Sequence, residues 1–248
     1  MSPTARLAIF DLDGTLMQTS AVDDDCYARA MAEVFGIVGM STDWGSYSHS
    51  TDGAILGDLI RQRLRREPTA LDAEALRERF VQLLAAEPAD RFRPTPGAAE
   101  AIAELRRAGW MAAIATGGWQ RSARLKLGRG GLEVEGLAAA FADDALSREE
   151  IILLAMARAH RRDVHDGKRG DGAERAVEVE AGARRAVYVG DGVWDLRAAN
   201  ALGLGFVGVA RGERAARLRD AGARIVLPDL ADATCAVTAI EREATLPP

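Results

Sequence analysis

The chain has 248 residues and a mean hydropathy of -0.09, which allows one large α/β domain or a core with a smaller module. Its formal net charge of -5 and its pI of about 5.4 give no indication of binding to nucleic acid or to an anionic membrane. No apolar run approaches the roughly 18 residues of a membrane span, and the stretch before Asp11 is too short for the apolar region of a signal peptide, so we expect a cytoplasmic protein.

The first predicted element is a strand over residues 7–10, LAIF, which is followed by two aspartates and then by Gly-Thr. A short, fully apolar run of this kind is typical of a central strand in a parallel sheet. Asp11 and Asp13 then lie at the carboxyl end of the strand, where open α/β sheets bind their ligands. Two carboxylates this close repel each other unless a cation or a shared proton offsets the repulsion.

The next segment, residues 17–92, has helical periodicity. The stretch AVDDDCYARAMAEVFG carries apolar residues at three- and four-residue spacing and ends in Gly36, a common helix terminator. GAILGDLIRQRLRR and LDAEALRERFVQLLAAE repeat the helical period, with polar breaks near 39–52 and 67–70. The whole segment is therefore predicted to be helical.

From about residue 93, strands and helices alternate. Strands are predicted at WMAAIAT, near FADD, and at RAVYVGD, GFVGVA and RIVLP, with helical stretches between them. This alternation indicates a doubly wound parallel, Rossmann-like α/β sheet. The sequence thus predicts a core over 1–16 and 93–248, with a helical cap domain over 17–92 inserted after the first strand. Residues 163–183 break the pattern and are interpreted as a surface loop, or a small hairpin around AVEVE.

Carboxylates follow two of the predicted strands. Asp11 and Asp13 follow the first, and RAVYVGD ends at Asp191, with Asp195 four residues further on. The carboxyl ends of parallel strands meet at one edge of the sheet, so we expect these side chains to lie close together. Hard oxygen ligands of this kind suit Mg²⁺, which also keeps several waters. The expected cation explains how the two aspartates of the first strand coexist.

A hydroxyl and two glycines follow the strand WMAAIAT. Thr116 ends the strand, and Gly117 and Gly118 leave the backbone N–H groups unobstructed before the next helix. Backbone N–H groups at the start of a helix bind anions. The sequence therefore predicts an anion site beside the carboxylates.

At this point the sequence resembles the haloacid dehalogenase-like hydrolase superfamily. DLDGT, the Thr116 that ends an apolar strand, and GDGVWD occur in the order of that superfamily's motifs, and the resemblance covers nearly the whole chain. The helical segment 17–92 resembles the cap of the branch that includes phosphoglycolate phosphatases and β-phosphoglucomutases.

The resemblance implies a role for each motif residue. Asp11 would attack phosphorus and form an aspartyl-phosphate, and Asp13 would act as general acid and then as general base. Mg²⁺ would be held by the Asp11 carboxylate, the Asp13 carbonyl and Asp191. Asp195 would orient a metal-bound water or a cationic residue. Thr116 and the neighbouring N–H groups of Gly117 and Gly118 would bind phosphate oxygens.

One position departs from the family pattern. The family has a lysine roughly thirty residues after the Ser/Thr, whereas this region reads FADDALSREEIILL and contains Arg148 instead. Arginine keeps the charge but is larger than an ammonium. We expect Arg148 to bind phosphate in place of the lysine. The alternatives are the chain's two lysines: Lys126, on the helix after Gly118, and Lys168, in the surface excursion.

Other polar residues have simpler interpretations. Ser147 and Glu150 fit a helix capping box, and Asp23, Asp24 and Asp25 fit the acidic start of the first cap helix. The basic runs RQRLRR and RSARLKLGR fit solvated helix faces rather than a nucleic-acid patch. Cys26 and Cys235 lie far apart in the sequence, which indicates two free thiols in a reducing compartment.

Substrate selection is expected in the cap segment DWGSYSHSTDG. Tyr47, His49, Thr51 and Asp52 are candidates to contact the hydroxyls of a substrate, although His49 is equally typical of a surface histidine. Trp119 and Trp194 stand beside the motifs and are candidates either to wall the pocket or to pack in the core.

These observations favour a Mg²⁺-dependent phosphatase that acts on a small phosphorylated metabolite, with no nucleic-acid or membrane partner and no prediction of oligomeric state. A phosphomutase of the same fold and a catalytically weak module that binds a phosphorylated ligand stay open as alternatives. Dehalogenase chemistry is disfavoured because it would not need Asp13 as acid and base. Phosphonate cleavage through a Schiff base is disfavoured because residues 17–92 contain no lysine.

Overall fold

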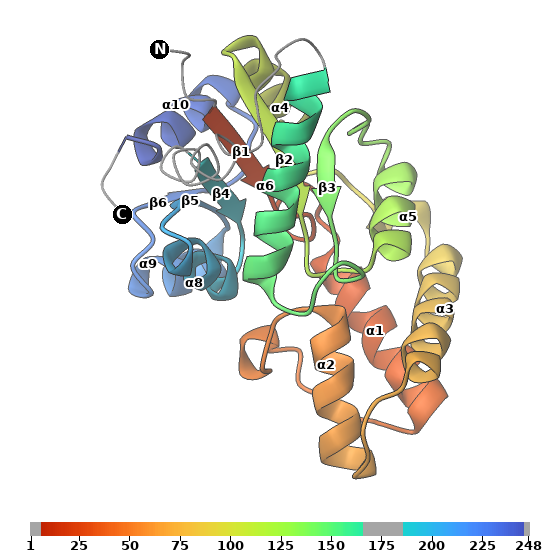
Figure 1. The fold of residues 1–248 in the computed structure, drawn as a ribbon. Coiled ribbons are helices and arrows are strands. Elements are labelled where there is room, and N and C mark those ends of the chain that lie inside the picture. The colour runs from red at the N-terminus through yellow and green to blue at the C-terminus, as the bar shows by residue number, and fades with distance from the viewer. Residues whose placement is uncertain (1–5, 166–185, 246–248) are drawn as a thin grey trace.

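A parallel sheet lies at the centre of the computed structural model, which describes residues 6–165 and 186–245 (Figure 1). Its described strands are β1 (Arg6–Phe10), β2 (Trp110–Ala115), β3 (Ala138–Ala140), β4 (Ala186–Gly190), β5 (Gly205–Val209) and β6 (Ile225–Leu227). They are arranged in the order β3-β2-β1-β4-β5-β6, and all neighbours are parallel. The first strand in sequence is thus a central strand, as its apolar run predicts.

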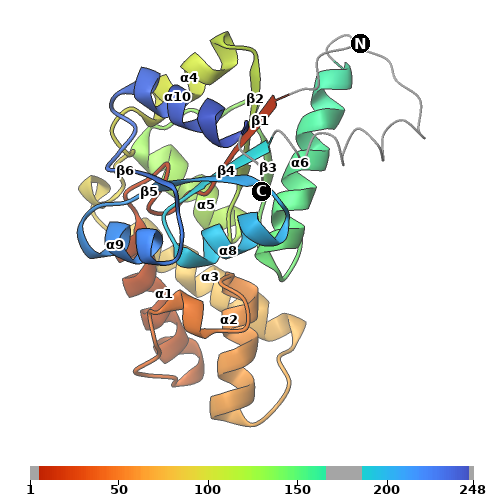
Figure 2. The same cartoon turned by 90° about the vertical axis from the view of Figure 1, so that its left-hand side faces the viewer.

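Helices cover both faces of the sheet. Successive side chains of a strand point to opposite faces, so Ala8 and Phe10 of β1 pack in one core and Leu7 and Ile9 in the other. The first core includes α4 (Ala98–Arg107), α10 (Ala233–Glu243) and part of α5 (Gln120–Gly130). The second includes α6 (Arg148–His165), α8 (Val193–Ala201) and α9 (Gly212–Asp220). Figure 2 shows α4 and α10 on the side of the sheet opposite α6. The predicted doubly wound fold is confirmed.

Residues between β1 and α4 form a helical insertion at the carboxyl end of the strands (Figures 1 and 2). Its helices are α1 (Ser20–Phe35), α2 (Asp52–Leu59) and α3 (Ala70–Ala86), with a turn of π-helix at Ile60–Leu64 and 3₁₀ turns at Trp44–Ser46 and Ala89–Arg91. They enclose a separate apolar core. In it the Tyr27 ring lies 5.4 Å from Phe80 and 6.0 Å from Trp119, measured between ring centroids. Because Trp119 follows β2, the main domain contributes to this second core.

The two segments that connect the insertion to the sheet lie side by side. The Gln18 N–H donates to the Arg93 carbonyl at 2.7 Å, and the Thr95 N–H donates to the Leu16 carbonyl at 2.9 Å. The chain therefore leaves and re-enters the α/β part at one place, close to the boundaries expected at residues 16–17 and 92–93.

Several local expectations can be compared with the structure. The predicted capping box is confirmed in part: the Ser147 hydroxyl accepts from the Glu150 N–H at 3.2 Å, but the Glu150 carboxylate accepts from the Ser147 hydroxyl, at 2.9 Å, rather than from its N–H. Cys26 and Cys235 are free thiols. Most of the excursion predicted over 163–183, including the AVEVE hairpin and Lys168, lies outside the described residues.

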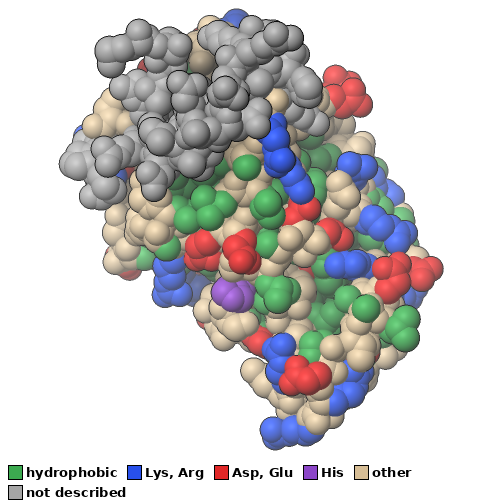
Figure 3. Space-filling view, viewed as in Figure 1, with side chains coloured by type: hydrophobic (Ala, Val, Ile, Leu, Met, Phe, Trp, Pro, Cys, Tyr) green, Lys and Arg blue, Asp and Glu red, His purple; other side chains and the backbone are tan. Residues whose placement is uncertain are grey.

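The prediction that the basic runs form solvated helix faces is only partly correct. Arg61 pairs with Asp58 and Glu67 at the surface, and Figure 3 shows acidic and basic side chains interspersed over the insertion in the lower half of the view. Lys126, by contrast, is fully buried. Periodicity failed here because α5 packs against α3, so its lysine points inward rather than to solvent. None of the described helices is long and apolar enough to span a bilayer.

Gly97, which precedes α4, lies against the backbone of Leu230. We expect Gly97→Ala to destabilise the fold by about 3 kcal/mol or more. Its φ is +79°, and an added Cβ would lie 1.9 Å from the Leu230 carbonyl oxygen. Gly36 is the matched control, because its φ is +70° but nothing lies within 4 Å of an added Cβ. Gly36→Ala should cost only about 1 kcal/mol of backbone strain. Urea unfolding of both variants measures the difference; equal losses would show that the overlap at Gly97 is relieved.

Candidate active site

Three neighbouring strands end at one edge of the sheet, and each is followed by a buried polar residue. Asp11 follows β1, Thr116 follows β2 and Asp191 follows β4, and these residues are only 2–3% exposed. They line one pocket together with Asp13, Gly117, Gly118 and the predicted cation Arg148, whereas Asp195 lies outside the pocket lining. The structure therefore brings the residues of the separate strand ends together.

Asp11, Asp191 and Asp195 form a carboxylate cluster, because one oxygen from each lies within 4.8 Å of the others. Burial raises the pKa of Asp11 to about 7, although Arg148 opposes the shift, and burial also raises the pKa of Asp191. Gly14 permits this crowding, because an added Cβ there would lie 2.0 Å from the Asp191 carboxylate. Buried carboxylates in contact with each other need a cation, and hard oxygen donors of this type fit Mg²⁺.

Asp195 differs from the other two members of the cluster. One of its oxygens accepts hydrogen bonds from the N–H groups of Asp191 and Gly192, at 3.1 and 2.9 Å, and the other lies 3.0 Å from the Arg148 guanidinium. Asp195 thus holds the turn after β4 and orients Arg148, whereas Asp11 and Asp191 are the better placed to hold a metal ion.

Arg148, the first residue of α6, lies beside Asp11. Its Nη1 is 3.2 Å from the Asp11 carboxylate and donates to the Tyr188 hydroxyl at 3.1 Å, while its Nη2 donates to the Ser50 carbonyl of the insertion at 2.9 Å. An added Cβ at Gly117 would lie 2.6 Å from Nη2, so glycine is needed for the guanidinium to fit. A positive charge at the start of α6 thus lies beside Asp11.

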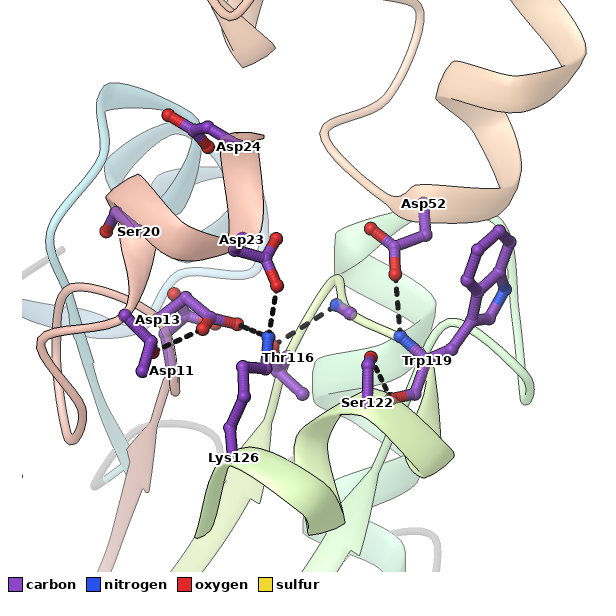
Figure 4. A network of polar contacts seen from close by, with 12 residues as sticks. Asp11, Asp13, Ser20, Asp23, Asp24, Asp52, Thr116, Trp119, Ser122 and Lys126 are labelled. Carbon is purple, nitrogen blue, oxygen red and sulfur yellow. Dashed lines mark hydrogen bonds and ion pairs between the residues drawn. The ribbon is translucent and has the colours of Figure 1, made fainter. Parts of the chain in front are cut away.

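Lys126 brings a second cation to the site from α5 (Figure 4). Its Nζ lies 2.5 Å from a carboxylate oxygen of Asp13 and 2.5 Å from one of Asp23, and the other Asp13 oxygen accepts a hydrogen bond from Thr19 at 2.6 Å. Burial lowers the pKa of Lys126, but the two carboxylates more than offset this and raise it above its ordinary value. Asp23 lies in the first turn of α1, as predicted, but its carboxylate also faces a buried lysine.

The turn after β2 offers fewer free N–H donors to an anion than the sequence predicts. The Gly118 N–H donates to the Thr116 hydroxyl at 3.2 Å, and the N–H groups of Trp119 and Gln120 donate to Asp52 and Asp143, at 2.9 and 2.6 Å. The Gly117 N–H donates to no acceptor among the described residues, and Gly117 lines the pocket. Thr116 and Gly117 thus remain available to an anion.

Of the four residues predicted to contact substrate from the cap segment, one lines the pocket and three do not. Asp52 lines the pocket. The Tyr47 hydroxyl donates to the Ser41 carbonyl at 2.8 Å, the Thr51 hydroxyl donates to the Leu146 carbonyl at 2.7 Å, and His49 is exposed outside the pocket. Trp194 lines the pocket, whereas Trp119 is buried in the core of the insertion.

Several residues of the site were not predicted. Arg214 of α9 pairs with Asp191 and donates to Ser20, and Tyr188 of β4 accepts from Arg148. Arg214 sits in an arginine-rich helix with no distinguishing spacing, and Tyr188 sits in an apolar strand, so neither carries a sequence signal. The other unpredicted lining residues are Ser20, Asp23, Asp24, Trp44, Ser50 and Ile55.

Comparisons with known proteins agree with this geometry. The family model for haloacid dehalogenase-like hydrolases matches residues 5–203. No curated protein matches the sequence.

Solved structures share the fold at low sequence identity. A hydrolase from Pseudomonas syringae is 22% identical with a TM-score of 0.67, over 93% of this chain and 96% of its own. A protein from Bacteroides vulgatus proposed to be a β-phosphoglucomutase is 16% identical with a TM-score of 0.69, over 98% and 91%. A protein from Haemophilus somnus predicted to be a phosphoglycolate phosphatase is 16% identical with a TM-score of 0.54, over 95% and 99%.

The Lys126 contacts predict a large loss of stability in Lys126→Met. Removing the buried ammonium leaves two partly buried carboxylates unpaired, and breaking a buried ion pair on one side costs about 3–5 kcal/mol. Adding Asp23→Asn should restore part of the loss, because it removes one of the unpaired charges. Thermal or urea unfolding of the single and double variants tests this. A double variant no more stable than Lys126→Met would contradict the electrostatic explanation.

The raised pKa of Asp52 leads us to expect that the free energy of unfolding depends on pH. Burial raises its pKa to about 7, with Lys126 opposing, so between about pH 4 and pH 7 the folded state binds more protons than the unfolded state at this group. This contribution makes the wild type less stable as the pH rises through that window, by up to about 4 kcal/mol. Asp52→Asn lacks the contribution, so its stability relative to wild type should increase from pH 4 to pH 7.5.

Asp72→Asn is the control with the opposite sign. Hydrogen bonds from Arg66 and Thr69 lower the pKa of Asp72, so its contribution is present above about pH 4 and is lost as the pH falls. The penalty of Asp72→Asn should therefore shrink in acid. Urea unfolding across the pH range measures both differences, and a pH-independent difference for Asp52→Asn would refute the assignment.

Proposed function

Because the chain belongs to the haloacid dehalogenase-like hydrolase family, we propose that it is a Mg²⁺-dependent phosphatase that hydrolyses a small phosphate monoester through an aspartyl-phosphate on Asp11. The observation that carries this proposal is the position of Asp11. It lies at the end of a central strand, in one pocket with a guanidinium 3.2 Å away and with a second carboxylate, Asp191, that can share a cation with it.

In the first step, an Asp11 oxygen forms a bond to phosphorus while the bond to the ester oxygen breaks. Arg148, the Thr116 hydroxyl and the Gly117 N–H bind the phosphate oxygens and stabilise the charge that develops on them. Bound Mg²⁺, held by Asp11, Asp191 and the Asp13 carbonyl, would offset the charge of the carboxylates and of the phosphate. In the second step, water attacks phosphorus and frees Asp11.

Asp13 supplies a proton to the leaving oxygen and later accepts one from the attacking water. Its carboxylate lies 2.5 Å from the Lys126 Nζ. To donate a proton in the first step, Asp13 has to exchange the Lys126 or Thr19 hydrogen bond for one to the leaving oxygen. Lys126 therefore acts through Asp13, whereas Arg148 takes the role of the family's lysine.

We propose that residues 17–92 are the cap domain of this enzyme. Several contacts link the insertion to the proposed site residues or their neighbours, among them Asp23 with Lys126, Ser50 with Arg148, and Asp52 with Trp119. The substrate would be a small phosphorylated metabolite, since the pocket lies beneath the insertion. The free thiols support the expected cytoplasmic location.

The site bears differently on the two alternative functions, a weakly active binding module and a phosphomutase. A binding module with little activity was favoured only by the absent lysine, and Arg148 now supplies that charge beside Asp11. A phosphomutase uses the same groups and would differ in transferring the phosphoryl group to a sugar hydroxyl rather than to water.

Hydrolysis of p-nitrophenyl phosphate with and without Mg²⁺ tests the proposal. Asp11→Asn should abolish turnover, and Arg148→Ala should lower kcat by about 10²–10³-fold, as for loss of one donor to a developing charge. Arg148→Lys should retain part of the activity because it keeps the charge.

Arg158→Ala is the matched control, since Arg158 lies on the same helix but pairs with Asp144 outside the pocket. It should leave kcat unchanged. Metal-dependent activity that survives Asp11→Asn would overturn the proposal, as would an inactive wild type on a panel of small phosphate esters.

A further inference from the structure

The pocket has an acidic wall that the proposed hydrolysis does not use. Asp24 of α1 and Asp52, the first residue of α2, line the pocket from the insertion rather than from the strand ends. Asp23, which precedes Asp24 in the sequence, also lines the pocket but is paired with Lys126. Within the part of the chain that the structure describes, neither Asp24 nor Asp52 forms an ion pair.

Asp52 has one carboxylate oxygen without a partner. One oxygen accepts from the Trp119 N–H at 2.9 Å, but the other accepts no hydrogen bond from any described residue, although the residue is only 7% exposed. Figure 4 shows this second oxygen pointing toward α1 and Asp23, into the space between the insertion and the turn after β2. Asp52 lines the pocket, so this oxygen is open to a ligand that carries a hydrogen-bond donor.

Asp24 lies in a similar environment with an aromatic neighbour. Its carboxylate accepts from the Trp44 indole N–H at 2.9 Å, and Trp44 and Trp194 both line this part of the pocket. Burial raises the pKa of Asp24 to about 6, which shows the cost of keeping this group ionised without a cation. Carboxylates beside indole rings are a common environment for an organic cation.

The charge balance of the pocket distinguishes between ligands. Among the described residues that line it are six carboxylates and only two guanidinium groups, those of Arg148 and Arg214. Even with Lys126 and a divalent metal ion, a phosphate dianion enters a pocket with no excess of positive charge. A neutral alcohol would leave this repulsion in place, whereas an ammonium group would offset it and pair with the acidic wall.

We propose that the substrate is the phosphate monoester of a short alcohol that carries a cationic amino group, bound by Asp24 and Asp52 while the phosphate lies at Asp11. The inference rests on the proposed function and names its substrate class. The chain between the two groups is short because Asp52 is attached to the proposed phosphate turn: its N–H donates to the Gly117 carbonyl at 2.9 Å.

Matched esters test this inference. We would measure kcat/KM for phosphoethanolamine and for propyl phosphate, which replaces the ammonium by a methyl group of similar size. Wild type should prefer the amino ester at least tenfold. Asp52→Asn and Asp24→Asn should each reduce this ratio toward one. Because the ratio is taken within each variant, a general loss of activity cancels.

Asp25→Asn is the charge-matched control. Asp25 adjoins Asp24 in the sequence but pairs with Arg91 at the surface and does not line the pocket, so the ratio should stay at its wild-type value. Faster hydrolysis of propyl phosphate by wild type would overturn the inference and leave the phosphatase proposal standing. A preference unchanged in both pocket variants would overturn the assignment to Asp24 and Asp52. No metal-dependent turnover of either ester or of p-nitrophenyl phosphate would overturn both proposals.

Discussion

Repulsion between buried carboxylates at one edge of the sheet is the constraint on which the site depends. A parallel sheet places the ends of β1 and β4 side by side, so Asp11 and Asp191 meet there. The same topology begins the following helices at that edge. Arg148 opens α6 and Arg214 lies in the first turn of α9, and each reaches one of these acids. The fold thus brings opposite charges to the edge from different elements, while the acid pair still has a place for a metal ion.

A second group of ion pairs, centred on Lys126, links the insertion to the α/β core. Lys126 contacts Asp13 of the core and Asp23 of α1, so one buried ammonium joins the first helix of the insertion to the loop after β1. The Asp52 contacts with Gly117 and Trp119 connect α2 to the turn that binds phosphate in our proposal.

The sequence predicted what local pattern determines. The alternation of strands and helices, the central place of LAIF and the residues at the strand ends follow from periodicity and from the rule that ligands bind at carboxyl ends. Residues of the site that lack such a pattern were not predicted. The inward direction of Lys126 depends on how α5 packs against α3. Arg214 is the arginine of α9 that lines the pocket, and its position along the helix does not distinguish it from its neighbours in the sequence. Thr51 was a reasonable candidate by position, but its hydroxyl is used by the Leu146 carbonyl.

Arginine at position 148 does more than preserve a charge. A lysine ammonium is a single point of charge, whereas the guanidinium has several nitrogens in a fixed plane. Here Nη1 faces Asp11 and the Tyr188 hydroxyl, and Nη2 donates to the Ser50 carbonyl of the insertion. Gly117 leaves the room that this larger group needs, and Asp195 holds it in place. Arg148 therefore connects the proposed nucleophile directly to the insertion, so the cation proposed to bind phosphate is held in part by a backbone group of the insertion.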